Sequence, residues 1–185
     1  APQNTRRFEI DKELTQKAWD LMKEENIDLN NIIVHAPYIV NLANNKDESK
    51  YDFSINFLRE EVRRCTELGI KYMVLHPGSS VGLGVDVALS NIIYALNIIL
   101  KDSQVTILLE TMAGKGTEVG VNFKEIKTII DGVDNKNKIG VCLDTCHIND
   151  AGYDLNNFDS VLDEFDKVIG LKYLKCLHIN DSKNV

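Results

Sequence analysis

The chain alternates strictly between short aliphatic runs and longer stretches with helical spacing. Five runs rich in β-branched and aliphatic residues have the length of buried strands: 32–34, 72–75, 105–109, 139–143 and 173–177. Apolar residues three or four positions apart predict helices over 53–65, 87–100, 123–130 and 158–169, and an opening helix over 14–22 behind Asp11. Because parallel strands need a crossover of a dozen or more residues, this alternation predicts an α/β fold with a parallel sheet covered by helices.

Two architectures have this alternation, a doubly wound sheet and a closed (β/α)8 TIM barrel. A complete barrel typically takes about 250 residues and eight strands. This chain has 185 residues and five predicted strands, and it opens on a helix and stops directly after a strand. We therefore expect residues 1–185 to form a single domain which, as a barrel, is truncated at both ends and has about five βα units.

Charge and composition limit the classes of protein and the setting. The formal net charge of −7 argues against a broad basic face for nucleic acid, although bound divalent cations would offset it locally. Four cysteines without a dense or CxxC-type spacing indicate free thiols in a reducing, cytoplasmic setting. No apolar run reaches the roughly 18 residues that span a bilayer, and no signal peptide is recognisable. We expect no membrane contact, and no protein partner is evident.

A potential metal ligand directly follows each predicted strand. These residues are His35, His76, Glu110, Asp144 and His178, and the last four are 34 positions apart at each step. In a barrel, equivalent positions at the carboxyl ends of successive strands converge on one mouth. His147, three residues after Asp144, is predicted in the loop above its strand and reaches the same mouth. The predicted site therefore uses all four histidines of the chain.

A single histidine or acid at a strand end is more often a hydrogen-bonded structural residue than a ligand. The joint placement of four histidines and two carboxylates favours a metal site. Mixed imidazole and carboxylate ligands suit zinc, or manganese, ahead of iron, whereas magnesium prefers oxygen ligands. Cys142 and Cys146 flank Asp144, and we expect them to pack in the core rather than to bind the metal.

Several segments, taken in order, carry a family resemblance. The strings HAPYIVNL, HPG, LETMAGKG, CLDTCHINDAGYD and HINDSKN resemble the bacterial, zinc-dependent endonuclease IV family of apurinic/apyrimidinic endonucleases. The resemblance covers essentially all 185 residues; DTCH with AGYD and the terminal HINDSK are its most specific parts. It implies a TIM barrel, here with the family's third to seventh strands. It also implies a base excision repair enzyme that hydrolyses the phosphodiester 5′ to an abasic site.

The resemblance also implies a cluster of three zinc ions at the barrel mouth. By motif, His35 and His76 bind the first zinc, Asp144 and His178 the second, and His147 the third, and Glu110 bridges the first two as the catalytic residue. The sequence departs from the family beyond Val185, where an Asp and a His of the third zinc site and a last-strand Glu would lie. We therefore expect the third zinc site to be incomplete in this chain.

Damaged double-stranded DNA is the partner that the resemblance implies. Reaching the lesion requires the abasic nucleotide to leave the stack, which costs least when the base is missing. The resemblance gives Tyr38 and Ile39 the role of wedges between base steps, although Tyr38 could equally pack on its own barrel. Phosphate contacts are expected from the N-terminal polar residues Gln3, Asn4, Arg6 and Arg7.

Two rival interpretations stay open. Related barrels include metal-dependent sugar isomerases, which also gather His, Glu and Asp ligands at strand ends. Such a site would have fewer histidines, and no lysine suited to orient an open-chain sugar is recognisable. Alternatively, the chain is an inactive metal-binding fragment.

Overall fold

The computed structural model describes residues 8–182 and contains one parallel sheet. Its strands are β1 Ile33–His35, β2 Tyr72–Leu75, β3 Thr106–Glu110, β4 Ile139–Asp144 and β5 Leu174–His178. Each strand pairs in parallel with the next strand in the chain, so the spatial order is β1-β2-β3-β4-β5. The predicted parallel α/β architecture is confirmed, and the five strands form part of a TIM barrel.

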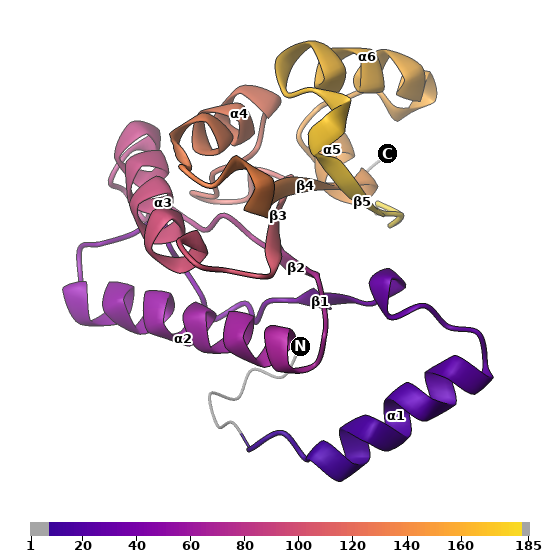
Figure 1. Ribbon diagram of the computed structural model, residues 1–185. Coiled ribbons are helices and arrows are strands. Elements are labelled where there is room, and N and C mark those ends of the chain that lie inside the picture. The colour runs from indigo at the N-terminus through magenta and orange to yellow at the C-terminus, as the bar shows by residue number, and fades with distance from the viewer. Residues whose placement is uncertain (1–7, 183–185) are drawn as a thin grey trace.

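Helices connect the strands and cover the outside of the sheet (Figure 1). The α-helices are α1 Lys12–Glu24, α2 Glu48–Glu67, α3 Val85–Leu100, α4 Phe123–Gly132, α5 Thr145–Asp150 and α6 Phe158–Val168. Short 3-10 helices are η1 Leu29–Asn31, η2 Lys136–Lys138, η3 Leu155–Asn157 and η4 Leu171–Tyr173. Contacts between α2 and α3, α3 and α4, and α4 and α6 make an outer arc of helices around a half-barrel.

Side chains cap the first turns of these helices. Asp11 accepts a hydrogen bond from the N–H of Leu14 at the start of α1, and Asp47 accepts one from Lys50 in α2. Asn122 caps α4 in the same way. Such caps satisfy backbone N–H groups that have no partner within the helix. The boundaries are therefore set by local sequence as well as by packing.

The two faces of the sheet bury different sets of residues, because side chains alternate along a strand. Met73, Leu75, Ile107 and Leu109 belong to the large core between strands and helices. The opposite, interior face buries a smaller cluster of Val74, Leu108 and Cys142, with Ile33, Tyr72 and Cys176 packed against it. Residues two positions further along β3, β4 and β5 continue this interior series towards the barrel mouth.

Residues near both ends of the described structure are less buried than those at its centre. No residue of α1 is buried, and the helix stands apart from the other helices in Figure 1. Within residues 8–182, β1 and β5 each pair with one neighbour, and β5 alternates between half-buried and exposed positions. None of the helices in this part of the chain has the length and apolar content needed to cross a membrane.

Two local expectations were wrong. His35, Glu110, Asp144 and His178 are the last residues of their strands rather than the residues that follow them. His147 lies in the short helix α5, not in a loop, because the Asp144 side chain caps that helix by accepting the His147 N–H at 2.9 Å. A six-residue helix is too short to produce a recognisable apolar period.

Candidate metal centre

Five strand ends deliver the predicted ligands to one place. His35, Glu110, Asp144 and His178 end β1, β3, β4 and β5, and His76 follows β2 directly. Glu110 and Asp144 are 2% and 1% exposed, whereas the four histidines are half-buried around them. The structure therefore brings together all six residues that the sequence analysis proposed as metal ligands.

Glu110 lies at the centre of the cluster. Its Oε2 is 3.0 Å from His35 Nε2 and 2.9 Å from His76 Nε2. Its other oxygen, Oε1, is 2.9 Å from His178 Nδ1 and 3.7 Å from His147 Nδ1. Each oxygen of this one carboxylate thus faces two imidazole rings, which is the arrangement needed of a group that bridges two metal ions.

Asp144 forms the second acidic position. Its Oδ1 accepts the His147 N–H, and its Oδ2 is 3.6 Å from His178 Nδ1 and accepts a hydrogen bond from Asn180 Nδ2. The backbone N–H of Asp144 donates to Thr111 Oγ1 at 3.0 Å. These bonds fix the position of a carboxylate that is otherwise buried.

Backbone carbonyls fix the tautomer of two histidines of the cluster. His35 Nδ1 is 2.8 Å from the carbonyl oxygen of Ala36, and His147 Nδ1 is 2.8 Å from that of Thr111. Since a carbonyl only accepts, Nδ1 carries the proton in both rings. The neutral rings therefore keep their lone pairs on Nε2.

This tautomer leaves two acceptors facing each other. The Nε2 lone pair of neutral His35 points at Glu110 Oε2 across 3.0 Å. A proton or a metal ion between the two atoms removes the repulsion. Hydrogen bonds from one ring nitrogen that orient the other are the usual surroundings of metal-binding histidines. The donor set therefore fits a cation.

The contacts within the cluster shift the pKa values of Glu110 and His35. Burial alone would raise the pKa of Glu110, but hydrogen bonds to His35, His76 and His178 outweigh burial and hold that pKa well below its usual range. The hydrogen bond to Glu110 raises the pKa of His35 despite its burial. The carboxylate is therefore ionised at neutral pH, and in the absence of metal His35 holds its proton more tightly than an ordinary histidine.

Two triads of imidazole and carboxylate donors lie close enough to share an ion. His35, His76 and Glu110 form one, and Glu110, Asp144 and His147 form the other, with the donor atoms of each triad within 4.8 Å of one another. Glu110 belongs to both. Imidazole and carboxylate donors in these numbers suit zinc-like ions better than magnesium.

Comparison with known proteins agrees with this geometry. Residues 1–185 match the family described as "Xylose isomerase-like TIM barrel". The chain belongs to this family. Within the xylose isomerase-like family, the sequence is 52% identical over 186 residues to a protein of Pediococcus pentosaceus named "Probable endonuclease 4". It is 50% identical to proteins of the same name from Staphylococcus aureus. The chain spans 62% of the length of these curated relatives, and they match all of it.

Two solved structures share the arrangement of strands. Endonuclease IV from Thermus thermophilus matches with a TM-score of 0.80 and 30% identity, over 98% of this chain and 64% of that one. A D-tagatose 3-epimerase-like protein matches with a TM-score of 0.73 over 92% of this chain and 62% of that one. Its 22% identity supports a common fold only. The resemblance to endonuclease IV is confirmed.

Of the residues predicted to contact DNA, the structure describes Tyr38 and Ile39. Tyr38 is 65% exposed, and its ring centroid lies 4.9 Å from that of His76 and 5.4 Å from that of His35. Ile39, the next residue, is 44% exposed and lines a pocket with Lys46 and Phe53. Tyr38 thus lies at the rim of the metal cluster and packs on two of its histidines. Gln3, Asn4, Arg6 and Arg7 fall outside the described residues.

Sequence reasoning missed the residues that orient the ligands. Thr111 contacts both Asp144 and His147, and Asn180 donates to Asp144. The Thr145 hydroxyl links the start of α5 to the segment after β5, since it contacts the carbonyls of His178 and Asn180 and accepts the Asn180 N–H. Each of these residues adjoins or closely follows a predicted ligand, which is the only signal the sequence offers.

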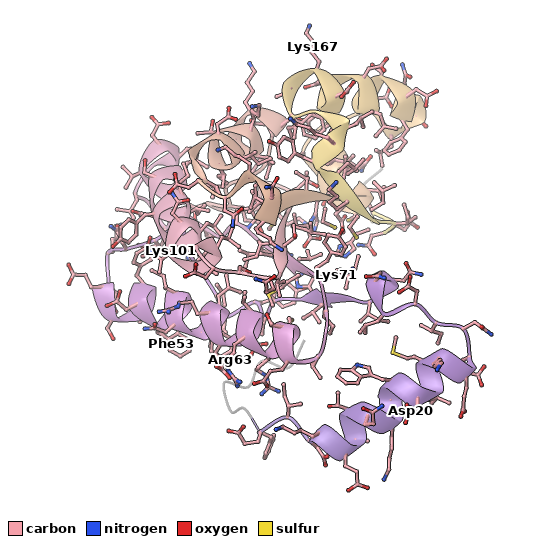
Figure 2. The ribbon with its side chains drawn as sticks, in the orientation of Figure 1. Asp20, Phe53, Arg63, Lys71, Lys101 and Lys167 are labelled. Atoms are coloured by element: carbon pink, nitrogen blue, oxygen red, sulfur yellow. The ribbon has the colours of Figure 1, made fainter. Side chains whose placement is uncertain are left out.

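Basic side chains of the outer layer gather in one place away from the ligand cluster. Arg59 and Arg63 of α2 and Lys101, which follows α3, line the same pocket, whereas Lys167 points outward from α6 (Figure 2). None of these three pocket residues belongs to the metal centre.

Proposed function

We propose that this protein is the metal-binding part of a DNA repair endonuclease that hydrolyses the phosphodiester 5′ to an abasic site. The observation that carries the proposal is the contact of Glu110 with His35, His76 and His178 at 2.9–3.0 Å, with Asp144 and His147 alongside. Similarity to proteins named endonuclease 4 and to a solved endonuclease IV supports the reaction type.

The proposed cofactor is zinc, with manganese as the alternative. His35 and His76 would hold one ion, Asp144 and His178 a second, and Glu110 would lie between the two. His147 would bind a third ion, and its donor atom lies within 4.8 Å of donor atoms of Glu110 and Asp144. When bound, zinc supplies positive charge against a phosphodiester and lowers the pKa of coordinated water.

The chain's own residues prepare the site before any ion or substrate arrives. Glu110 is held ionised and Asp144 is held by hydrogen bonds, both in buried positions, so little reorganisation accompanies binding. The carbonyl of Ala36 holds the His35 ring in the tautomer that leaves Nε2 free towards Glu110. The His35 ring therefore need not reorient when an ion binds.

Damaged double-stranded DNA is the proposed partner. Tyr38 is exposed at the rim of the centre, and Ile39 is the exposed residue after it; aromatic and apolar side chains of this kind suit insertion at a gap in the base stack. Gln3 and Asn4 remain proposed phosphate contacts. The cost of extruding a nucleotide is lowest where the base is missing, which would give the selectivity for abasic sites.

The decisive test combines metal analysis with cleavage of an abasic duplex. We expect the purified protein to contain zinc at more than one ion per chain and to cut the strand 5′ to the lesion, leaving a 3′-hydroxyl. Glu110→Gln should lose bound zinc and at least about a hundredfold in cleavage rate. Glu164→Gln, at an exposed position of α6, is the matched control and should change neither.

Other outcomes decide between the rivals. Zinc bound without any cleavage would contradict the nuclease proposal for this chain and favour an inactive metal-binding fragment. Isomerisation of an aldose without DNA cleavage would favour the sugar isomerase interpretation. Full cleavage by Glu110→Gln would remove Glu110 from the mechanism.

A further inference from the structure

Two cysteines lie side by side directly beneath the metal centre. Cys142 of β4 and Cys176 of β5 are register partners, and Asp144 and His178 are the next interior pair towards the mouth. Adjacent strands in a sheet are about 4.8 Å apart, so facing side chains on them meet. The two sulfur atoms and a ring nitrogen of His178 all lie within 4.8 Å of one another.

The surroundings of this pair are otherwise apolar. Cys142 is fully buried with Val74 and Leu108, and Ile33 and Tyr72 pack against the same cluster. Cys176 is half-buried at β5, which pairs only with β4 in the described part of the chain. The two sulfurs therefore lie among apolar side chains.

We propose that Cys142, Cys176 and His178 form a second, sulfur-rich metal site that binds soft cations such as Cd2+ or Cu+. Thiolate ligands select soft ions, whereas the imidazole and carboxylate centre above suits borderline ones. Binding forms two metal–sulfur bonds and one metal–nitrogen bond, and it releases the two thiol protons to solvent.

Sharing of His178 couples the two sites. His178 Nδ1 lies 2.9 Å from Glu110 Oε1, so the same ring faces the upper centre. An ion held by Cys142 and Cys176 competes for this ring and weakens zinc binding beside Asp144. The lower site would thus make the protein sensitive to inhibition by soft metals. The thiol site itself does not depend on the proposed nuclease function.

The test is titration of the metal-free, reduced protein with Cd2+, followed by the ultraviolet thiolate-to-cadmium charge-transfer band. Imidazole and carboxylate ligands give no such band, so ions in the upper centre do not contribute. We expect one equivalent of Cd2+ to produce the band. Cys176→Ser and Cys142→Ala should each weaken Cd2+ binding at least about tenfold and reduce the band.

The other two cysteines provide matched controls. Cys65 is buried in α2, and Cys146 is half-buried in α5. Cys65→Ala and Cys146→Ala should leave the band unchanged. Absence of the band in the unsubstituted protein, or its loss only in these control variants, would overturn the proposal. Because Cys142→Ala opens space in a packed cluster, the half-buried Cys176→Ser variant, checked by circular dichroism, keeps the test decisive.

A competition experiment tests the coupling. Preloading with one equivalent of Cd2+ should weaken zinc binding at least about tenfold in the unsubstituted protein and not in Cys176→Ser. Equal zinc affinity with and without Cd2+ would exclude the sharing of His178. The charge-transfer band does not depend on DNA cleavage. A protein that fails to cleave DNA but shows the band would contradict the nuclease proposal and still support the thiol site.

Discussion

Thr111 Oγ1 accepts the backbone N–H of Asp144 at 3.0 Å, and the Thr111 carbonyl oxygen lies 2.8 Å from His147 Nδ1. Thr111, the residue after Glu110, therefore positions both Asp144 and His147. Thr111 is itself buried. The link joins the ends of β3 and β4 at the point where their ligands must meet.

We predict that Thr111→Val destabilises the metal-free protein by about 1–3 kcal/mol, because the buried Asp144 N–H loses its side-chain acceptor while the shape of the residue is kept. Urea denaturation measures the loss. Thr128→Val is the matched control, since the Thr128 hydroxyl bonds only to Lys124 of its own exposed helix turn. Equal losses in the two variants would contradict the assigned role of Thr111.

Gly78 in the HPG segment is expected to tolerate no side chain. Its φ is +121°, and a Cβ there would lie 2.4 Å from Asn41 Oδ1, which accepts the N–H groups of Ala43 and Ser79. Gly78→Ala should cost about 2–4 kcal/mol from backbone strain and broken hydrogen bonds. Gly152→Ala has a φ of +98° but no atom within 4 Å, so thermal denaturation should show a smaller loss. Indistinguishable melting temperatures would exclude the clash with Asn41.

Zinc affinity should fall as the pH is lowered through the pKa of His35. The hydrogen bond to Glu110 raises this pKa above its ordinary value of 6.5 in the metal-free protein. Zinc needs the neutral ring, so protons compete with it below the raised pKa and not above it. Competition with a chromophoric chelator at pH ~6 and ~8 measures the difference. His35→Gln should bind zinc more weakly at both pH values and flatten the dependence; an unchanged slope would contradict the prediction.

Tyr38→Ala should weaken binding to an abasic duplex by about 1–3 kcal/mol, the range for aromatic stacking on nucleic acid. Binding to an intact duplex should change little, because no gap accepts the ring. Fluorescence anisotropy with both duplexes measures the two affinities. Tyr94→Ala is the control, since Tyr94 is 62% exposed on α3, away from the strand ends. A Tyr38→Ala protein that binds both duplexes as before would leave Tyr38 as a packing residue only.

The repeating unit of this protein and the ligands at its strand ends could be predicted from the sequence. His76, Glu110, Asp144 and His178 recur every 34 residues because each step adds one strand and one crossover helix. In a parallel half-barrel, residues at equal steps share a face and an end. The observed contacts of Glu110 with His76 and His178 confirm that these side chains meet.

How these side chains are held could not be predicted from the sequence. The contacts of Thr111 with Asp144, of Asn180 with Asp144, and of Cys142 with Cys176 cross between neighbouring strands or their following segments. They depend on strand register, including the shift between Val141 and Cys142, and on ring rotation about single bonds. A periodic pattern specifies which face a residue occupies, whereas register and rotamer specify which atom it meets, and these follow from packing of the whole sheet.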